Sequence, residues 1–336
     1  MERTTVATVA VGEGIGFSVV TGAEADDGIS RRLAAGLFPQ EYRPTLEILR
    51  ATAPPLGRVL DLGAHVGTFS LAAAALGYQV AAVEASPRNA NLLRESVARN
   101  GFDRMRIIEA AIGDRLGTLE FCPYGPYGHV AQAGSNSPTV VVPALTADRL
   151  LDDLGWDRPD FIKMDVEGSE VATIRGMARR LVGEDAPPIV YESNGHTLHF
   201  FGMTPYDLKS ALERLGYRNY LLEPGRLVPV RASDLQPETV IDYLAIKSLP
   251  ETLRPWEIAA ARPDEEIVAQ ILATCGSPNV PERAYIARML ASSPRTLRRF
   301  PEVARAFAAL QADPIAEVRQ AAVRPSWWNR WLSRSA

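Results

Sequence analysis

The sequence is poor in cysteine, in lysine and in long apolar stretches. Its 336 residues contain two cysteines, too few for a disulfide framework or a zinc cluster, and no apolar run reaches the 18 residues typical of a membrane-spanning helix. The first residues also lack the long apolar stretch of a signal peptide. A net charge of −4 argues against a strongly basic protein that binds nucleic acid or membrane surfaces. We therefore expect a soluble, cytoplasmic protein with neither of these partners.

Lysine is rare even among the basic residues. Only Lys163, Lys209 and Lys247 occur among 36 basic residues, and this excess of arginine is typical of a GC-rich genome. From Leu249 onward there are 12 arginines and 9 acidic residues, a balance of +3 that leaves −7 for the rest of the chain. The C-terminal part is therefore where we expect a protein partner, or a second copy in a homodimer, to bind.

Sequence patterns divide the chain into three parts. Residues 1–50 hold an alternating stretch at 5–21, interrupted by glycines, which predicts a β-hairpin followed by a helical cap. Residues 51–249 alternate amphipathic helices with short strands that are apolar on both faces. This alternation predicts a parallel sheet covered by helices on both faces, with 217–223 and 240–247 paired antiparallel. The strands predicted before that pair are 58–62, 79–85, 105–112, 160–166 and 188–193.

Residues 250–336 are predicted to form a helical extension. Three pairs resemble helix openers, Ser277-Pro278, Ser293-Pro294 and Asp313-Pro314, and the first and third are 36 residues apart. This spacing is close to one helix-pair repeat of the HEAT type, and an ordinary helical appendage is the alternative. The segment Trp327–Trp331 either anchors the chain end or forms an interaction surface.

A glycine-containing loop follows the strand at 58–62. That strand carries Asp61. Gly63 and Gly67 come after it and before a helix, and the next strand reaches Glu84. Glycines let a ligand approach the backbone, and a carboxylate at Glu84 can accept hydrogen bonds from two ribose hydroxyls. A dinucleotide site needs glycine where this chain has His65, and Asp61 would repel a pyrophosphate but attract an ammonium group. The loop therefore favours S-adenosylmethionine over a dinucleotide.

Several motifs together resemble one family. The stretches DLGAHVGTFS, VEASPRNANLLRESVARNG, AAIGDRLGTLEF and FIKMDVEGSE resemble those of the FkbM family of S-adenosylmethionine-dependent methyltransferases, over about residues 38–247. The resemblance implies an α/β fold with a seven-stranded, Rossmann-like doubly wound sheet whose last strand is antiparallel. It also implies methyl transfer to a hydroxyl of a small natural product or sugar, with S-adenosylhomocysteine as the product. The family usually carries asparagine where this chain has His65, a departure without an explanation in the sequence.

The resemblance also implies which residues bind the cofactor. The glycine loop would line its methionine end, Glu84 would hold the ribose, and Ala111 and Ile112 would border the adenine, with Asp114 nearby. The complete predicted set is Glu41, Tyr42, Asp61, Gly63, His65, Gly67, Glu84, Ala85, Ser86, Ala111, Ile112 and Asp165.

The predicted catalytic residues are His196, Asp165 and Glu192. Histidine is the usual base near neutral pH, so we expect His196 to accept a proton or orient the acceptor, with Glu192 as its partner or as a substrate anchor. Asp165 ends a strand next to the one carrying Asp61, so both should face one cleft. Replacing His196 by alanine is then predicted to preserve cofactor binding and to abolish most turnover.

Acceptor contacts are predicted on the loops around this cleft. The loop 122–138, rich in glycine, proline and serine, is interpreted as a lid over the acceptor, and a surface excursion is the alternative. Glu170 is either a site residue or an acid favoured by the dipole at a helix start. The predicted substrate-binding residues are Tyr124, Tyr127, His129, Glu170 and Asn194.

No metal is included in the predicted site. His196 and His199 form only a weak two-ligand motif, and Mg²⁺ held by Asp165 and Glu192 is a less favoured alternative. The leading hypothesis is O-methylation of a small molecule. The alternatives are N-methylation of an amide or amine, an NAD(P)-dependent oxidoreductase, and a cofactor-binding scaffold without catalysis.

Overall fold

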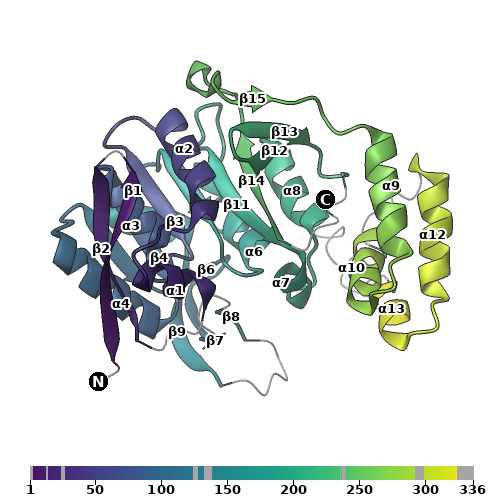
Figure 1. Cartoon of the computed structure of the whole chain (residues 1–336), viewed down its shortest axis with the longest axis horizontal. Helices are drawn as coiled ribbons and strands as arrows, with labels where there is room; N and C mark the ends of the chain where they lie inside the picture. Colours follow the sequence, from purple (N-terminus) through teal and green to yellow (C-terminus); the bar gives the residue numbers. More distant parts are fainter. Residues whose placement is uncertain are drawn as a thin grey trace.

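The computed structural model describes residues 3–12, 14–23, 27–123, 128–131, 138–234, 236, 240–291 and 299–323. Figure 1 shows a hairpin of β1 (Thr4–Gly12) and β2 (Ile15–Gly22) beside an α/β body, with a group of helices on the opposite side. Among the residues described, no helix is long and apolar enough to cross a membrane.

The α/β body is built on a nine-stranded sheet. Its strands in spatial order are β15 (Glu257–Ile258), β13 (Arg226–Val230), β12 (Arg218–Glu223), β14 (Val240–Ile246), β11 (Ile189–Asn194), β10 (Phe161–Met164), β3 (Arg58–Leu62), β4 (Gln79–Glu84) and β5 (Met105–Glu109). The five strands from β11 to β5 are parallel, and β14 is antiparallel to both β11 and β12. The sheet has more strands than the seven predicted, because the chain reverses at Gly225 into β13, which then pairs with β15.

Helices cover both faces of this sheet. Side chains alternate along a strand, so Val59 packs into one core and Leu60 into the other. The first core includes side chains of α1 (Gly28–Ala34), α2 (Arg43–Thr52), α3 (Thr68–Ala75) and α4 (Pro87–Asn100). The second core is covered by α5 (Ala147–Leu154), α6 (Glu170–Arg175) and α8 (Pro205–Arg214). The doubly wound arrangement follows from strands that are apolar on both faces.

The predicted strand 105–112 is divided between two sheets. Residues 105–109 form β5, and the chain then enters a four-stranded sheet ordered β6 (Ala111–Gly113), β9 (Val140–Thr146), β7 (Gly117–Cys122) and β8 (His129–Val130). The division occurs at Ala110, whose amide still donates to the carbonyl of Glu84 on β4. As a result, Ala111 and Ile112 leave the main sheet near the end of β4.

The N-terminal hairpin is fixed to helix α4. Asn100 accepts a hydrogen bond from the amide of Ser18 at 2.7 Å, and the Ser96 hydroxyl accepts one from the amide of Val20 at 2.8 Å. Phe17 and Val19 are buried in the first core. Helix α1 (Gly28–Ala34) follows, capped by Asp27, and a 3₁₀ turn at Gln40–Tyr42 leads into α2.

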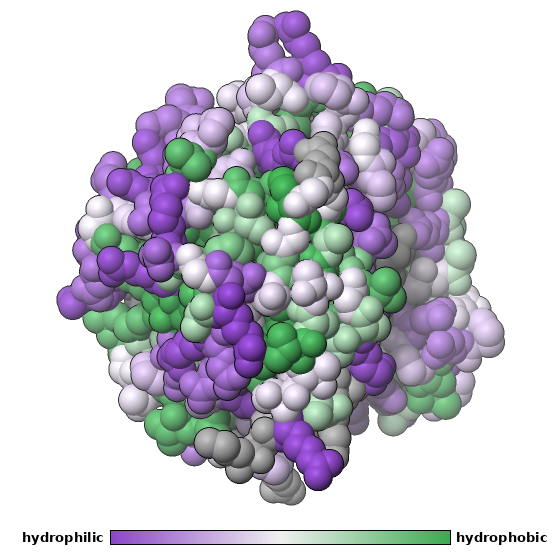
Figure 2. Space-filling model, turned by 60° about the vertical axis from the view of Figure 1, so that its left-hand side comes forward, coloured by the Kyte–Doolittle hydropathy of each residue, from purple (hydrophilic) through white to green (hydrophobic). Residues whose placement is uncertain are grey.

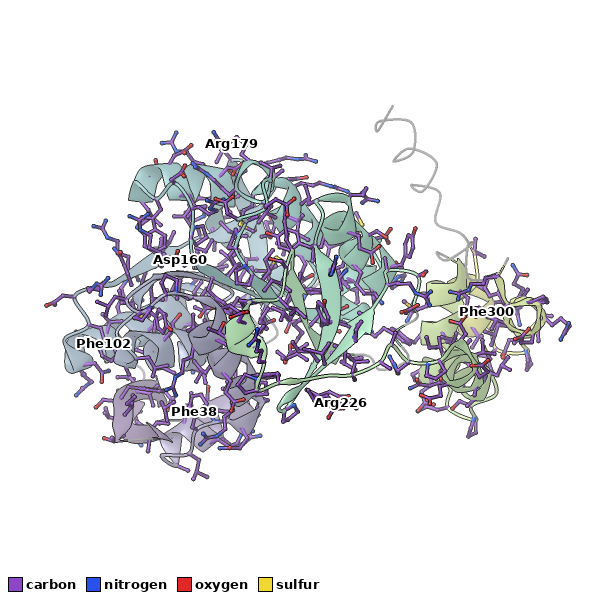
Figure 3. All side chains as sticks on the ribbon, turned by 90° about the horizontal axis from the view of Figure 1, so that it is seen from above. Phe38, Phe102, Asp160, Arg179, Arg226 and Phe300 are labelled. Carbon is purple, nitrogen blue, oxygen red and sulfur yellow. The ribbon has the colours of Figure 1, made fainter. Side chains whose placement is uncertain are left out.

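The helical extension has a core of its own. Its described helices are α9 (Asp264–Cys275), α10 (Val280–Ala291), α12 (Pro301–Gln311) and α13 (Ala316–Ala321). Ile286 and Val303 are fully buried in this core, and an ion pair of 2.9 Å joins Arg283 to Asp313. Figure 3 places Phe300, in this extension, at the opposite end of the molecule from Phe102. The pair Ser293-Pro294 and the three tryptophans lie outside the described residues.

The visible outer surface is mixed in character. On the face in Figure 2, hydrophobic and hydrophilic residues are interspersed. Exposed apolar side chains such as Val141 and Leu116 come from separate strands and turns. Scattered apolar residues of this kind are usual on folded proteins and do not by themselves indicate a function.

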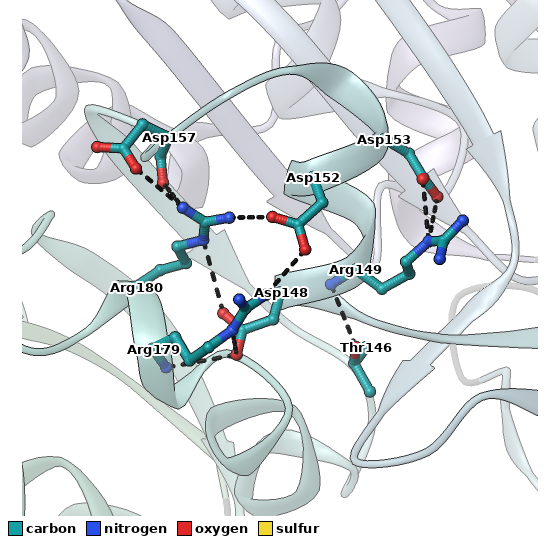
Figure 4. Close-up of polar contacts among 8 residues, drawn as sticks. All are labelled: Thr146, Asp148, Arg149, Asp152, Asp153, Asp157, Arg179 and Arg180. Carbon is teal, nitrogen blue, oxygen red and sulfur yellow. Dashed lines mark hydrogen bonds and ion pairs between the residues drawn. The ribbon is translucent and has the colours of Figure 1, made fainter.

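An ion-pair network ties α5 to the turn at Ala178–Arg180 (Figure 4). The Arg180 guanidinium, only 13% exposed, contacts Asp152, Asp157 at 3.0 Å and Asp148 at 3.7 Å. Removing the shared cation leaves Asp148 partly buried with less compensation, so Arg180→Ala should lower the free energy of unfolding by about 1–2 kcal/mol. Chemical denaturation measures this. Arg149→Ala, which breaks the exposed pair with Asp153, is the control and should change little, and an equal effect of both would contradict the account.

Candidate active site

A cleft of about 410 Å³ lies at the carboxyl ends of the parallel strands. It is lined by the loop after β3, the end of β4, the second sheet, the loop after β10, the end of β11 and the start of β14. The N-terminal cap closes one side through residues of α1 and of the 3₁₀ turn before α2. Neighbouring strands β3 and β10 lead to helices on opposite faces of the sheet, which is where ligands bind in such folds.

The two glycines of the loop after β3 are required by packing. Gly63 and Gly67 have φ of 83° and 91°, which side chains rarely adopt. A Cβ at Gly63 would lie 1.7 Å from the carbonyl oxygen of Asp165, and one at Gly67 would lie 2.2 Å from a methyl of Leu93. Gly63 lines the cleft, whereas Gly67 is not among the lining residues. The two glycines therefore let the loop pack closely against Asp165 and Leu93. The sequence had predicted only that they let a ligand approach the backbone.

Glu84 is a buried carboxylate that faces the cleft. It is 7% exposed and accepts hydrogen bonds from the amides of His65 at 2.7 Å and Ser86 at 2.8 Å. Burial raises the pKa of Glu84, while these bonds favour its ionised form. The side-chain amide of Asn89 also donates to it, at 3.4 Å. A carboxylate has about four acceptor positions, so one is open to a ligand hydroxyl and a second hydroxyl could replace this long bond.

Apolar residues line the cleft together with Glu84. Ala85, Ala111 and Ile112 line the cleft, together with Phe121, which the sequence did not single out. Ser86 does not line it. Instead, Ser86 caps α4 and donates its amide to Glu84, so its contribution is to hold the carboxylate. Asp114 also lies outside the lining.

Asp61 lies below the cleft, against Lys163. Asp61 is fully buried, and the hydroxyl of Ser70 donates to it. Lys163 is 3.6 Å from Asp61, 3.1 Å from Asp165 and 3.0 Å from the carbonyl of Gly63. The predicted contact of Asp61 with a cofactor ammonium is therefore not supported, because Asp61 is covered and already faces a cation.

Lys163 is another cleft-lining residue that sequence reasoning missed. Burial alone would lower the pKa of Lys163, but the carboxylates of Asp165 and Asp61 hold it well above its usual value. The lysine lines the cleft and joins the loop after β3 to the loop after β10. Its place in the K-x-D-V-E-G stretch, in a chain with so few lysines, was an available signal.

Acidic side chains gather at the end of the cleft beside β11 and β14. Asp165, Glu167 and Glu192 bring carboxylate oxygens within 4.8 Å of one another, and Asp242 lies directly opposite Glu192 on the neighbouring strand. Burial, with the nearby carboxylates of Asp165 and Glu170, raises the pKa of Glu167 to about 8. Burial and Asp165 likewise raise the pKa of Asp242 to about 7 and that of Glu192 well above its usual range.

These raised pKa values predict a pH-dependent stability. Glu167 ionises near 4.5 when unfolded but near 8 when folded, so its protonated form favours the folded state and that contribution is lost as pH rises between these values. Without cofactor, the thermal midpoint should therefore fall from pH 5 to pH 8, and Glu167→Gln should flatten the decline. Calorimetric unfolding measures it, with Glu223→Gln, a half-buried position away from the cleft, as control. An unchanged slope in Glu167→Gln would contradict the assignment.

Glu170 and Asn194 hold the loops that carry these acids. Glu170 is 1% exposed, does not line the cleft, and accepts hydrogen bonds from the amides of Val166 and Gly168. Burial raises the pKa of Glu170 to about 7. Asn194 lines the cleft, caps α7 (Gly195–Phe200) and donates to Glu167 at 3.4 Å. The predicted substrate contact is thus placed for Asn194 but not for Glu170.

The predicted base, His196, lies away from this cluster. His196 and His199 are exposed on α7 and are not among the cleft-lining residues. The ring of His196 packs edge-on against Phe200 at 4.9 Å, and His129 approaches Phe200 from β8 at 5.9 Å. Although the side chain reaches solvent, partial desolvation and the nearby Arg288 lower the pKa of His199 to about 4. The structure thus gives no support to His196 as the base. Tyr124 and Tyr127 lie outside the described residues.

The N-terminal cap supplies the remaining predicted contacts. Glu41 and Tyr42 both line the cleft, and Glu41 pairs with Arg32 at its rim. Burial raises the pKa of Tyr42 above its usual range. His65 lies 3.8 Å from Asp27 of the cap, and burial lowers the pKa of His65 to about 4, so the imidazole is neutral. Its Nδ1 is buried without a hydrogen-bond partner.

Comparison with known families identifies the domain that holds this cleft. Residues 61–219 match the family described as the methyltransferase FkbM domain. This match confirms the FkbM resemblance that the motifs predicted. A comparison with curated proteins finds no match.

Two of the solved structures similar to this chain are described as methyltransferases. One is an S-adenosylmethionine-dependent methyltransferase from Agrobacterium tumefaciens, with 15% identity, 73% of this chain and 71% of that chain covered, and a TM-score of 0.39. Another is precorrin-6y C5,15-methyltransferase from Geobacter metallireducens, with 16% identity, coverage of 61% and 86%, and a TM-score of 0.36.

Proposed function

We propose that this protein transfers a methyl group from S-adenosylmethionine to a hydroxyl of a small natural product or sugar. The observation that carries the proposal is that one cleft of a methyltransferase domain combines Glu84 with the acidic cluster of Asp165, Glu167 and Glu192. A ribose acceptor at one end and proton acceptors at the other are the two functions that such a reaction needs.

The cofactor half of the cleft fits S-adenosylmethionine. Glu84 has one open acceptor position for a ribose hydroxyl, and a second hydroxyl could replace the long bond from Asn89. Ala111, Ile112 and Phe121 offer apolar surface for the adenine. The buried Nδ1 of His65 has no partner and belongs to a lining residue, so it is available to a ligand. When bound, the cofactor supplies a methyl group on a sulfonium, which is already activated for transfer.

The acidic half of the cleft fits removal of the acceptor proton. A general base works best when its pKa lies near the working pH, which the pKa of about 8 at Glu167 shows this half of the cleft can reach. Burial and the neighbouring carboxylates also raise the pKa of Glu192. We assign the acceptor's O–H proton to the carboxylate of Glu192, with Glu167 and Asn194 beside it. Glu192 replaces His196 in this role because it lines the cleft and His196 does not.

An amine acceptor is the second candidate. Glu192, Asp242 and Glu167 lie together in the cleft, and carboxylates attract a cationic amine before its proton is removed. A dinucleotide reaction is disfavoured, because His65 lines the cleft where a pyrophosphate would need glycine.

Mg²⁺ is the alternative use of the acidic cluster. Three carboxylate oxygens within 4.8 Å of one another can surround one ion, although the pKa of about 8 at Glu167 favours its protonated form at neutral pH. Turnover after dialysis against EDTA, with and without added Mg²⁺, separates the two uses. Unchanged turnover supports a carboxylate base, whereas loss and recovery with Mg²⁺ supports the ion.

Transfer of a labelled methyl group tests the proposed function. The full chain is incubated with methyl-labelled S-adenosylmethionine and a small-molecule extract, and labelled products are separated by mass. We expect label in small polar molecules with wild type and with Glu223→Gln, a variant at the end of β12 and outside the cleft lining. Label in protein or RNA only would overturn the acceptor class.

A further inference from the structure

Helix α10 of the extension contacts the end of strand β11. The hydroxyl of Tyr285 donates to the carbonyl of Gln236 at 2.9 Å, and the tyrosine is 7% exposed. Its ring covers Gly195, where a Cβ would lie 2.4 Å from ring atom Cε2. Gly195 is not in the left-handed region, so it is the space taken by Tyr285 that requires glycine. Figure 1 shows α10 beside α7, which begins at Gly195.

Gln236 connects Tyr285 to two strands of the main sheet through hydrogen bonds. It is fully buried, its Nε2 donates to the carbonyl of Ser193 at 2.8 Å, and its Oε1 accepts from the hydroxyl of Tyr243 at 3.2 Å. Ser193 belongs to β11 and Tyr243 to β14. Tyr285 and Gln236 thus form a chain of hydrogen bonds from the helical extension to both strands.

These two strands carry the acidic half of the cleft. Glu192 and Asp242 are directly opposite across the β11–β14 pair, next to Ser193 and Tyr243, and Asn194 precedes Gly195. Like charges opposite one another on paired strands destabilise the pairing, so their approach needs support from surrounding contacts. The cofactor half has separate support, because Glu84 is held by amides within the methyltransferase domain itself.

We propose that Tyr285 is a positioning residue for the acceptor half of the active site, acting through Gln236 and Gly195. This inference rests on the proposed function, which makes this half of the cleft the acceptor site. It assigns to the extension, which lies outside the matched family domain, a part in building the cleft. Loss of the Tyr285 contact should loosen the ends of β11 and β14 that carry Glu192 and Asp242, and should leave the Glu84 end unchanged.

The test compares Tyr285→Phe with Tyr217→Phe in the full chain. Tyr217 is a matched control, since its hydroxyl is also buried and donates at 2.9 Å to a backbone carbonyl, that of Pro187 before the other end of β11. Hydrogen–deuterium exchange reports the opening of 189–194 and 240–246. The carbon-13 carboxyl resonance of Glu192, assigned with Glu192→Gln, reports its titration. Calorimetry with S-adenosylhomocysteine reports the cofactor half.

We expect exchange in both segments to be about fivefold faster in Tyr285→Phe than in wild type, as for loss of one buried hydrogen bond. The titration midpoint of Glu192 should shift to lower pH as its acidic neighbours move apart, and Tyr217→Phe should show neither change. Affinity for S-adenosylhomocysteine should be unchanged in both variants.

Unchanged exchange and titration in Tyr285→Phe, or equal changes in Tyr217→Phe, would overturn the positioning role. Gly195→Ala provides a second approach: it should loosen the same segments, and less so when combined with Tyr285→Ala, which removes the clashing ring. If wild type does not bind S-adenosylhomocysteine, the proposed function fails, while the exchange comparison still decides whether Tyr285 supports the strands.

Discussion

Glu84→Gln should reduce the affinity for S-adenosylmethionine by about 100-fold or more, the effect of losing two charge-assisted hydrogen bonds. Glu84 is the buried carboxylate of the cofactor half, and each of its oxygens already accepts from one backbone amide. A glutamine can accept at only one oxygen, so one amide loses its acceptor and the ribose meets an NH₂ group. Calorimetric titration measures the loss, and a thermal scan establishes that the variant is folded.

Glu109→Gln is the matched control for this experiment. Glu109 is the residue paired with Glu84 on the neighbouring strand, but it forms an ion pair with Arg94 and does not line the cleft. Its substitution should leave the affinity for S-adenosylmethionine unchanged. An unchanged affinity in Glu84→Gln itself would remove the ribose assignment and with it the orientation of the cofactor.

Glu192→Gln should lower turnover by about 10²–10⁴-fold, the usual contribution of a general base. The amide keeps the shape of the side chain but cannot accept the acceptor's proton. Affinity for S-adenosylmethionine should change little, because Glu84 lies in the other half of the cleft. Initial rates of labelled methyl transfer at saturating cofactor measure this.

His196→Ala distinguishes the two candidate bases. The sequence predicted a large loss of turnover for this variant, whereas the exposed position of His196 outside the cleft lining now predicts turnover close to wild type. A large loss in His196→Ala together with normal rates in Glu192→Gln would reverse our assignment.

The regular parts of the fold could be predicted from local pattern. Strand β3 has the predicted bounds, and α4 begins and ends where its serine cap and following glycine indicate. Both features depend on residues adjacent in sequence. The strand at 105–112 was wrong in extent, since no local signal shows that the chain changes sheets at Ala110.

The site was predictable to the extent that strand ends determine it. Glu84, Asp165 and Glu192 face one cleft because they end parallel strands, or lie near their ends. Burial at Asp61 was not predictable, because it depends on Lys163 from another strand filling the space above. The contact of Tyr285 with Gly195 joins distant segments, and an isolated sequence offers no periodicity that would indicate it.

The most direct measurement of the central claim is calorimetric titration of the full chain with S-adenosylhomocysteine and, separately, with NAD⁺. The account predicts one binding site for S-adenosylhomocysteine that depends on Glu84, and no binding of NAD⁺. Binding of NAD⁺ without binding of S-adenosylhomocysteine would contradict it.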